Sequence, residues 1–173
     1  MKGKLFLAFT LIILAVLCFA IYQKEDIIAT GDEFYITLES VEPRSIGQGD
    51  YMILNYDYNP KKNNSMGRRV EIPDPQCIIC EYAILNLSAT GVVKGYTLAN
   101  DKVIGDNQVL LKIKRHEPLK FVADTFFFQE GKAEMFSNAK YARFKHKDGE
   151  AILVSLHNKN FREIRHEDED ESK

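Results

Sequence analysis

Residues 51–58 read YMILNYDY, and this stretch decides the fold class. Large side chains recur at every second position from Met52 to Tyr58, with Asn55 and Asp57 among the residues between them. Residues 34–39, FYITLE, repeat the alternation. A period of two is typical of a β-strand with one buried face, so both stretches are predicted to be strands.

The rest of the chain shows more short segments of this kind. Strands are expected at residues 82–87, 92–98, 109–114, 125–128, 141–145 and 151–157. Turn-forming residues separate them, as in Asn100-Asp101 and Asp148-Gly149. Short strands at this spacing predict a mainly β domain, an antiparallel sandwich or barrel. One exception is expected at residues 132–140, where helical spacing predicts a single short helix.

The amino terminus carries a different signal. Residues 5–22 contain no charged side chain and would span about 27 Å as a helix, close to the roughly 30 Å hydrocarbon core of a bilayer. Their twelve Leu, Ile, Phe and Val residues favour insertion by roughly 4–7 kcal/mol. We therefore expect a transmembrane anchor. A signal peptide cleaved after Ala20 and a buried core helix are the alternatives.

Charges flanking the apolar segment predict its orientation. Lys2 and Lys4 precede it, whereas Lys24 is followed at once by Glu25 and Asp26. The positive-inside rule then holds the amino terminus in the cytoplasm and places the rest of the chain outside, in the periplasm or at the cell exterior. The predicted organisation is a cytoplasmic stub and anchor at 1–24, an extracytoplasmic β-domain at 30–161, and a disordered acidic tail at 162–173.

Composition excludes several classes of protein. The 25 acidic and 23 basic side chains give a formal net charge of -2. This balance argues against a nucleic-acid-binding protein, which needs clustered positive charge. The 173 residues contain three cysteines, too few for a disulfide-rich miniprotein. We expect neither a cofactor nor a metal site, because no motif in the sequence has ligand spacing.

Residues 49–56, GDYMILNY, fit the pattern G-D-Y-x-x-L-x-Y without a mismatch at Gly49, Asp50, Tyr51, Leu54 and Tyr56. A second block follows near the carboxyl end, with FFQEG at 127–131 and GEAIL at 149–153. The chain therefore resembles the GDYXXLXY family over most of residues 33–157. The resemblance implies a bacterial single-pass membrane protein and implies no activity.

The motif can be explained by structure alone, because Gly49 can form a turn, Asp50 can accept backbone hydrogen bonds, and Leu54 and Tyr56 share a strand face. A binding site is the alternative. Arg44 and Glu130 each lie beside a backbone breaker and could pair with Asp50 or with each other. The candidate binding residues are therefore Arg44, Asp50, Tyr56 and Glu130, which would accept a small molecule or an envelope polymer.

Ser40-Val41-Glu42-Pro43, followed by Gly49-Asp50, is similar to the Ser-x-x-Pro…Gly-Asp arrangement of type I signal peptidases. Those enzymes use a Ser nucleophile that a neutral Lys activates, so Ser40 and Lys62 are the catalytic candidates of this alternative. The Gly-Asp pair lies one residue farther from the serine than it does in those enzymes. Lys62 also lies in a polar stretch, where an ammonium group stays hydrated and protonated.

Cys77 and Cys80 form a C-x-x-C motif. Outside the cytoplasm this spacing favours a local disulfide or two free thiols over a redox pair or half of a zinc site. Together these features predict a non-enzymatic, membrane-anchored module that contacts lipid through residues 5–22 and binds another membrane protein or the envelope. Signal-peptidase-like hydrolysis is the second hypothesis, and ligand binding around the GDY motif is the third.

Overall fold

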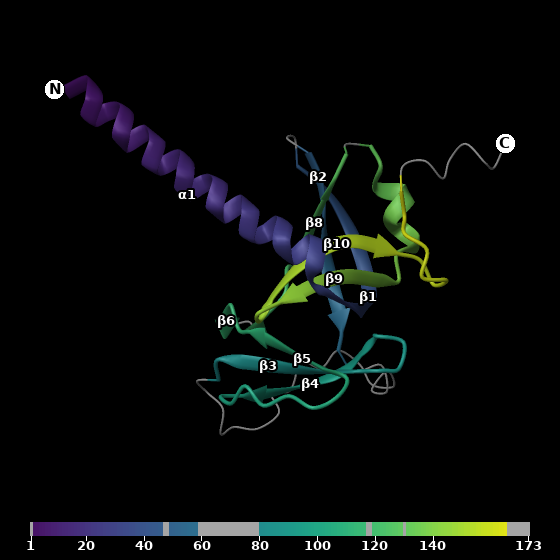
Figure 1. Cartoon of the computed structure of the whole chain (residues 1–173). Coiled ribbons are helices and arrows are strands. Elements are labelled where there is room, and N and C mark those ends of the chain that lie inside the picture. The colour runs from purple at the N-terminus through teal and green to yellow at the C-terminus, as the bar shows by residue number, and fades with distance from the viewer. Residues whose placement is uncertain (1, 47–48, 59–79, 117–118, 130, 166–173) are drawn as a thin grey trace.

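The computed structural model describes residues 2–46, 49–58, 80–116, 119–129 and 131–165, and within these it leaves out the side chains of 2, 5, 40–46, 49–50, 115, 116 and 119. The chain begins with one long helix, α1 (Lys2–Thr30), which projects away from a β-domain (Figure 1). At about 1.5 Å per residue, α1 is roughly 43 Å long and exceeds the thickness of a bilayer core. It therefore extends eight residues beyond the predicted span, from Tyr22 to Thr30.

Five antiparallel strands form the larger sheet, in the order β10-β9-β1-β2-β8. Their bounds are β1 (Asp32–Ile46), β2 (Gly49–Asp57), β8 (Thr125–Phe128), β9 (Tyr141–Lys147) and β10 (Glu150–His157). The first half of β1 pairs with β9 and the second half pairs with β2, so the long strand β1 joins the two ends of the sheet. Both predicted strands that decided the fold class lie in its centre.

A second, three-stranded sheet has the order β4-β3-β5 and is also antiparallel. It consists of β3 (Tyr82–Leu87), β4 (Val93–Ala99) and β5 (Gln108–Lys112), and two-residue strands β6 (Arg115–His116) and β7 (Leu119–Lys120) pair beside it. The predicted short helix is a 3-10 helix, η2 (Ala133–Asn138). The mainly β, antiparallel fold class is confirmed.

The core lies between the two sheets. Five inward-facing side chains of the two central strands are at most 2% exposed: Phe34, Ile36 and Leu38 on β1, and Met52 and Leu54 on β2. They meet the inward face of the smaller sheet, represented by Leu85 and Leu111, and the buried Phe121 belongs to the same cluster. The larger sheet also bonds to the connection between β3 and β4, where the Tyr35 N–H donates to the Gly91 carbonyl at 2.9 Å. The period-two pattern is thus satisfied by burial of one face of each sheet.

Helix α1 contributes no described side chain to this core cluster. An 18-residue apolar window within Phe6–Thr30 has a mean hydropathy of 2.4, and none of it is buried within the domain. The large side chains from Phe6 to Tyr22 are exposed, whereas Ile27 near the carboxyl end of the helix is buried. The buried core helix considered as an alternative is therefore wrong for this chain. The helix is long and apolar enough to cross a membrane.

The packed domain extends beyond residue 161, its expected end. Ile164 packs on the core and its N–H donates to the Leu156 carbonyl at 2.9 Å. Glu163 forms an antiparallel bridge with His157. Residues 162–165 of the expected tail thus return along β10, whereas 166–173 lie outside the described residues.

Candidate functional site

The family motif occupies β2, between β1 and β8. In the backbone register Arg44 faces Tyr51, and Asp50 faces Ser45 on β1 and Phe128 on β8. The side chains of Arg44 and Asp50 are not described, and Glu130 lies outside the described residues. Convergence of the three groups therefore stays a prediction. Ser40 pairs with Asn55 in the register, and Lys62 lies outside the described residues, so the hydrolase hypothesis also stays untested.

Tyr56, the last residue of the motif, points into the domain. Its hydroxyl donates a hydrogen bond to the Ala123 carbonyl, and its ring lies 5.8 Å from that of Tyr58 and 6.0 Å from that of Phe144. Burial raises the pKa of the Tyr56 phenol well above its ordinary value. Leu54 shares this face and is 2% exposed. Both motif residues therefore hold β2 against the core.

Cys80 lies two residues before the start of β3 and is buried and disulfide-bonded. Cys77, its proposed partner, lies outside the described residues. Cys18 lies in α1 with an exposed free thiol. Disulfides persist in oxidising compartments, so the state of Cys80 bears on where the domain resides.

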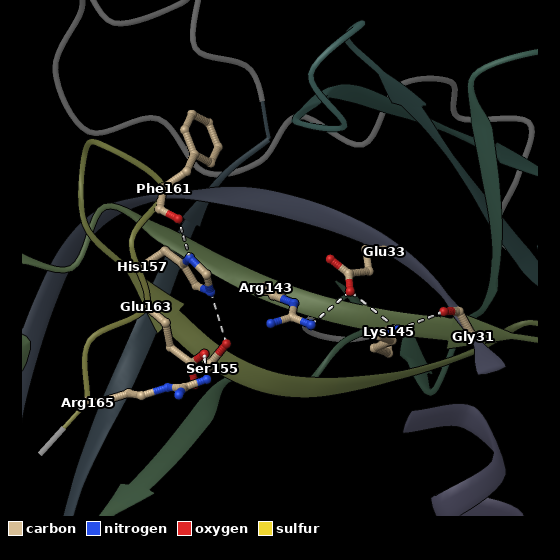
Figure 2. Close-up of polar contacts among 9 residues, drawn as sticks. All are labelled: Gly31, Glu33, Arg143, Lys145, Ser155, His157, Phe161, Glu163 and Arg165. Carbon is tan, nitrogen blue, oxygen red and sulfur yellow. Dashed lines mark hydrogen bonds and ion pairs between the residues drawn. The ribbon is translucent and has the colours of Figure 1, made fainter. Parts of the chain in front are cut away.

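A polar group that the motif does not include gathers on the outer face of the larger sheet, the face turned away from the core (Figure 2). We call it the outer-face cluster. Its members come from β1, β9, β10 and the returning carboxyl-terminal segment: Glu33, Arg143, Lys145, Ser155, His157 and Glu163. Cross-strand pairing places Ser155 opposite Arg143 and His157 opposite Tyr141.

The centre of the cluster is a Ser–His pair. The Ser155 Oγ lies 3.0 Å from the His157 Nε2, and the His157 Nδ1 lies 2.9 Å from the Phe161 carbonyl oxygen. A carbonyl oxygen only accepts, so Nδ1 carries a proton. In the neutral ring Nε2 then accepts from the Ser155 hydroxyl. This is the polarity of a nucleophile and its general base.

Burial argues against catalysis at this pair. Ser155 and His157 are each 5% exposed. The ring of Tyr35 meets that of His157 edge to face at 5.5 Å, and the rings of Phe161 and Tyr141 stack at 4.4 Å above the same strands. A substrate has no approach through these contacts. What the pair does in this conformation is fasten residues 158–165 to the sheet.

Ion pairs extend the cluster across the sheet (Figure 2). Glu33 accepts from the Arg143 Nη2 at 2.8 Å and lies 3.3 Å from the Lys145 Nζ. Partial burial alone would raise the pKa of the Glu33 carboxyl, but hydrogen bonds from the two cations lower it below its ordinary value. These ion pairs join two strands, because Glu33 lies on β1 and its partners lie on β9. Ser155 on β10 lies opposite Arg143 in the backbone register.

The same edge of the sheet holds the end of α1, in what we call the helix–sheet joint. The Lys147 Nζ contacts the Asp26 Oδ2 at 2.6 Å and the Thr30 Oγ1 at 2.9 Å, and Lys24 pairs with Glu150. The Lys145 Nζ donates to the carbonyl of Gly31 at 3.1 Å. The joint therefore fixes the direction in which α1 leaves the domain.

Sequence reasoning missed both the outer-face cluster and the joint. The signal for the cluster is present in Tyr141-Ala142-Arg143-Phe144-Lys145, where polar residues alternate with core residues. The joint had a weaker signal, since Asp26 and Lys147 are 121 positions apart and only the fold brings them together.

These features define a class of protein, namely a two-sheet antiparallel β-domain fixed to one exposed apolar helix. The family comparison then identifies it. The model of the GDYXXLXY protein family matches residues 13–156, and the chain belongs to that family. No curated protein and no solved structure matches the chain.

Proposed function

We propose that this chain is a single-pass membrane protein whose β-domain lies outside the cytoplasm and binds another membrane or envelope protein without catalysing a reaction. The exposed apolar face of α1 carries the proposal. An aqueous environment leaves the large side chains from Phe6 to Tyr22 hydrated, whereas a bilayer removes them from water at a gain of about 25 cal/mol for each Å². About 20 of the 29 helical residues span the bilayer core, and the remainder reach the helix–sheet joint.

Two observations support the orientation. Lys2 and Lys4 precede the span, and the positive-inside rule retains such residues in the cytoplasm. The disulfide-bonded state of Cys80 fits an oxidising compartment on the other side. The helix also runs without a break through Ala20, which favours an anchor over a signal peptide cleaved at that position.

The helix–sheet joint supports a binding role. Ion pairs on both sides of α1 and the buried Ile27 hold the domain at a set angle to its anchor, so its outer surfaces are presented in a fixed direction. A flexible linker would present them at random. The buried Ser155–His157 pair gives no support for hydrolysis.

Membrane fractionation of the full chain tests the anchor. Replacing Leu14 and Leu17 by Arg adds about 2.5–3.5 kcal/mol each to the insertion free energy, which cancels the roughly 4–7 kcal/mol gained by the segment. We expect the wild type to remain in membranes after alkaline washing and the double variant to be released, while Leu14→Phe behaves as wild type. Wild-type protein recovered as a soluble protein would contradict the anchor.

Protease accessibility and pull-down test orientation and binding. Protease added from outside should digest residues after 31 and spare the amino terminus in sealed cells from which the outer barrier is removed. Cross-linking of the intact protein in membranes, compared with the Leu14→Arg, Leu17→Arg variant, should recover a partner only with the anchored form. A domain that resists external protease, or an anchored form that recovers no partner, would contradict the corresponding part of the proposal.

A further inference from the structure

Strand β8 is a terminal strand of the larger sheet, with β2 on one side. The Leu54 N–H donates to the Asp124 carbonyl at 2.9 Å, which fixes Leu54 and Asp124 as a hydrogen-bonded pair. Antiparallel pairing alternates such pairs with non-bonded ones, so Phe126 and Phe128 bond to β2. Thr125 and Phe127 turn their N–H and C=O groups the other way, and within the described ranges no backbone group bonds to them.

One side chain on this edge is also exposed. Phe127 is 76% exposed, and the ring of Tyr51 lies beside it at 6.2 Å. Its neighbours Phe126 and Phe128 face inward and lie 5.3 and 5.2 Å from the ring of Phe136 in η2. Residues 125–128 contain no charge and no Pro, the usual features that prevent edge strands from pairing with other chains.

We propose that β8 pairs in antiparallel fashion with β8 of a second copy of this chain. A register centred on Phe126 places Thr125 of each copy opposite Phe127 of the other. Both outward-facing residues of each copy then exchange their hydrogen bonds, and the two five-stranded sheets become one. The exposed Phe127 rings lie on the same face of the joined sheet, where they cover each other and Tyr51.

A second copy fits this edge better than a strand of different chemistry, because the edge is complementary to itself. Two uncharged strands meet without repulsion although the whole chain carries a net charge of -2. The two-fold axis is normal to the joined sheet, so the same face of the domain points the same way in both copies. Confinement to a bilayer raises the effective concentration of the edges, and this effect depends on the proposed anchoring.

Cysteine cross-linking of the full chain tests the register. In a Cys18→Ser background, copies carrying Thr125→Cys are mixed with differently tagged copies carrying Phe127→Cys and oxidised in vesicles and in detergent. We expect the mixed disulfide dimer to exceed, by about tenfold or more, the product formed when either is mixed with Val103→Cys. Val103 is 80% exposed on a distant loop and reports random collision. Equal yields would overturn the proposal.

Association measurements on the full chain test the backbone contact separately. Phe127→Pro removes an N–H that the domain itself does not use, a position where an edge strand tolerates proline. Phe127→Leu keeps the N–H and an apolar side chain. Losing one or two hydrogen bonds should weaken association about tenfold for Phe127→Pro, while Phe127→Leu stays within about threefold of wild type. Equal association of the two variants, or a monomer at every concentration, would overturn the proposal. The fractionation test above is independent of this result, so failure of pairing and failure of anchoring are distinguishable.

Discussion

Gly31 joins α1 to β1 at a point where the chain has no room for a side chain. A Cβ built there would lie 2.4 Å from the Ile27 carbonyl oxygen and 2.8 Å from the His146 carbonyl oxygen. Both neighbours are backbone atoms, and the first already accepts the Gly31 N–H at 2.9 Å. Gly31→Ala therefore requires the helix end or β9 to move, and no side-chain rotation relieves the contact.

Either movement strains the helix–sheet joint. Overpacking of this kind costs about 1–3 kcal/mol. For a domain of this size that corresponds to a fall in Tm of roughly 4–12 °C. The Lys147–Asp26 contact and the Lys145 bond to the Gly31 carbonyl should weaken with it. We expect faster hydrogen exchange in β9 and in the last turn of α1 than elsewhere in the domain.

Thermal unfolding of the full chain in detergent, followed by near-UV circular dichroism, measures the effect. Gly95→Ala in β4 is the matched control, because its Cβ would meet the Tyr58 carbonyl oxygen at an ordinary 3.6 Å. It should leave Tm within about 2 °C of wild type, as surface substitutions usually do. A Gly31→Ala protein that unfolds with the control would refute the tight joint.

Three further predictions concern stability. Ser155→Ala leaves the buried His157 Nε2 without its donor and should lower the free energy of unfolding by about 1–3 kcal/mol in chemical denaturation. Ser137→Ala at an exposed site should lower it by less than about 0.5 kcal/mol. Equal losses would contradict the stabilising role of the Ser155–His157 pair. The pKa of Glu33 is lowered in the folded state, so the stability that Glu33 contributes is present above the ordinary Glu pKa near 4.3 and is lost as pH falls through the lower folded value. Glu33→Gln should therefore flatten the decline in stability below about pH 5. An unchanged slope would count against the ion pairs. Burial raises the pKa of the Tyr58 phenol, so the stability that the protonated phenol contributes is fully present below about pH 10 and is lost as pH rises above it. Tyr58→Phe should therefore reduce alkaline unfolding measured by fluorescence. An identical profile would show that another group controls the alkaline transition.

Strands could be predicted from the sequence because burial of one face leaves a local signature. The alternation in residues 34–38 and 52–56 records which side chains meet the core, and no distant residue is needed to recognise it. The fold class and the presence of one apolar helix follow from such local patterns, although the helix extends eight residues beyond the predicted span. Strand order does not follow from them, because β8 lies beside β2 in space although the strands of the smaller sheet separate the two in the sequence.

The outer-face cluster shows where local patterns fail. Ala151 and Leu153 face the core, and strict alternation would also turn Ser155 inward. The register shifts between Leu153 and Ser155, so Leu156 enters the core and Ser155 and His157 face outward. A bulge of this kind is set by pairing with β9, which sequence alternation alone does not reveal. The binding candidates around Asp50 depend on contacts of the same non-local kind.

The helix–sheet joint and the open edge lie at opposite ends of one sheet. Helix α1 contacts β9 and β10, whereas β8 terminates the other end, so docking of α1 leaves that edge uncovered. The motif strand β2 lies between them, bonded to β1 on one side and to β8 on the other, with Leu54 and Tyr56 fixing it to the core. The residues that define the family therefore support the strand that presents the edge. On this argument, a change in β2 that loosens Tyr56 should weaken association through β8 while leaving the joint with α1 intact.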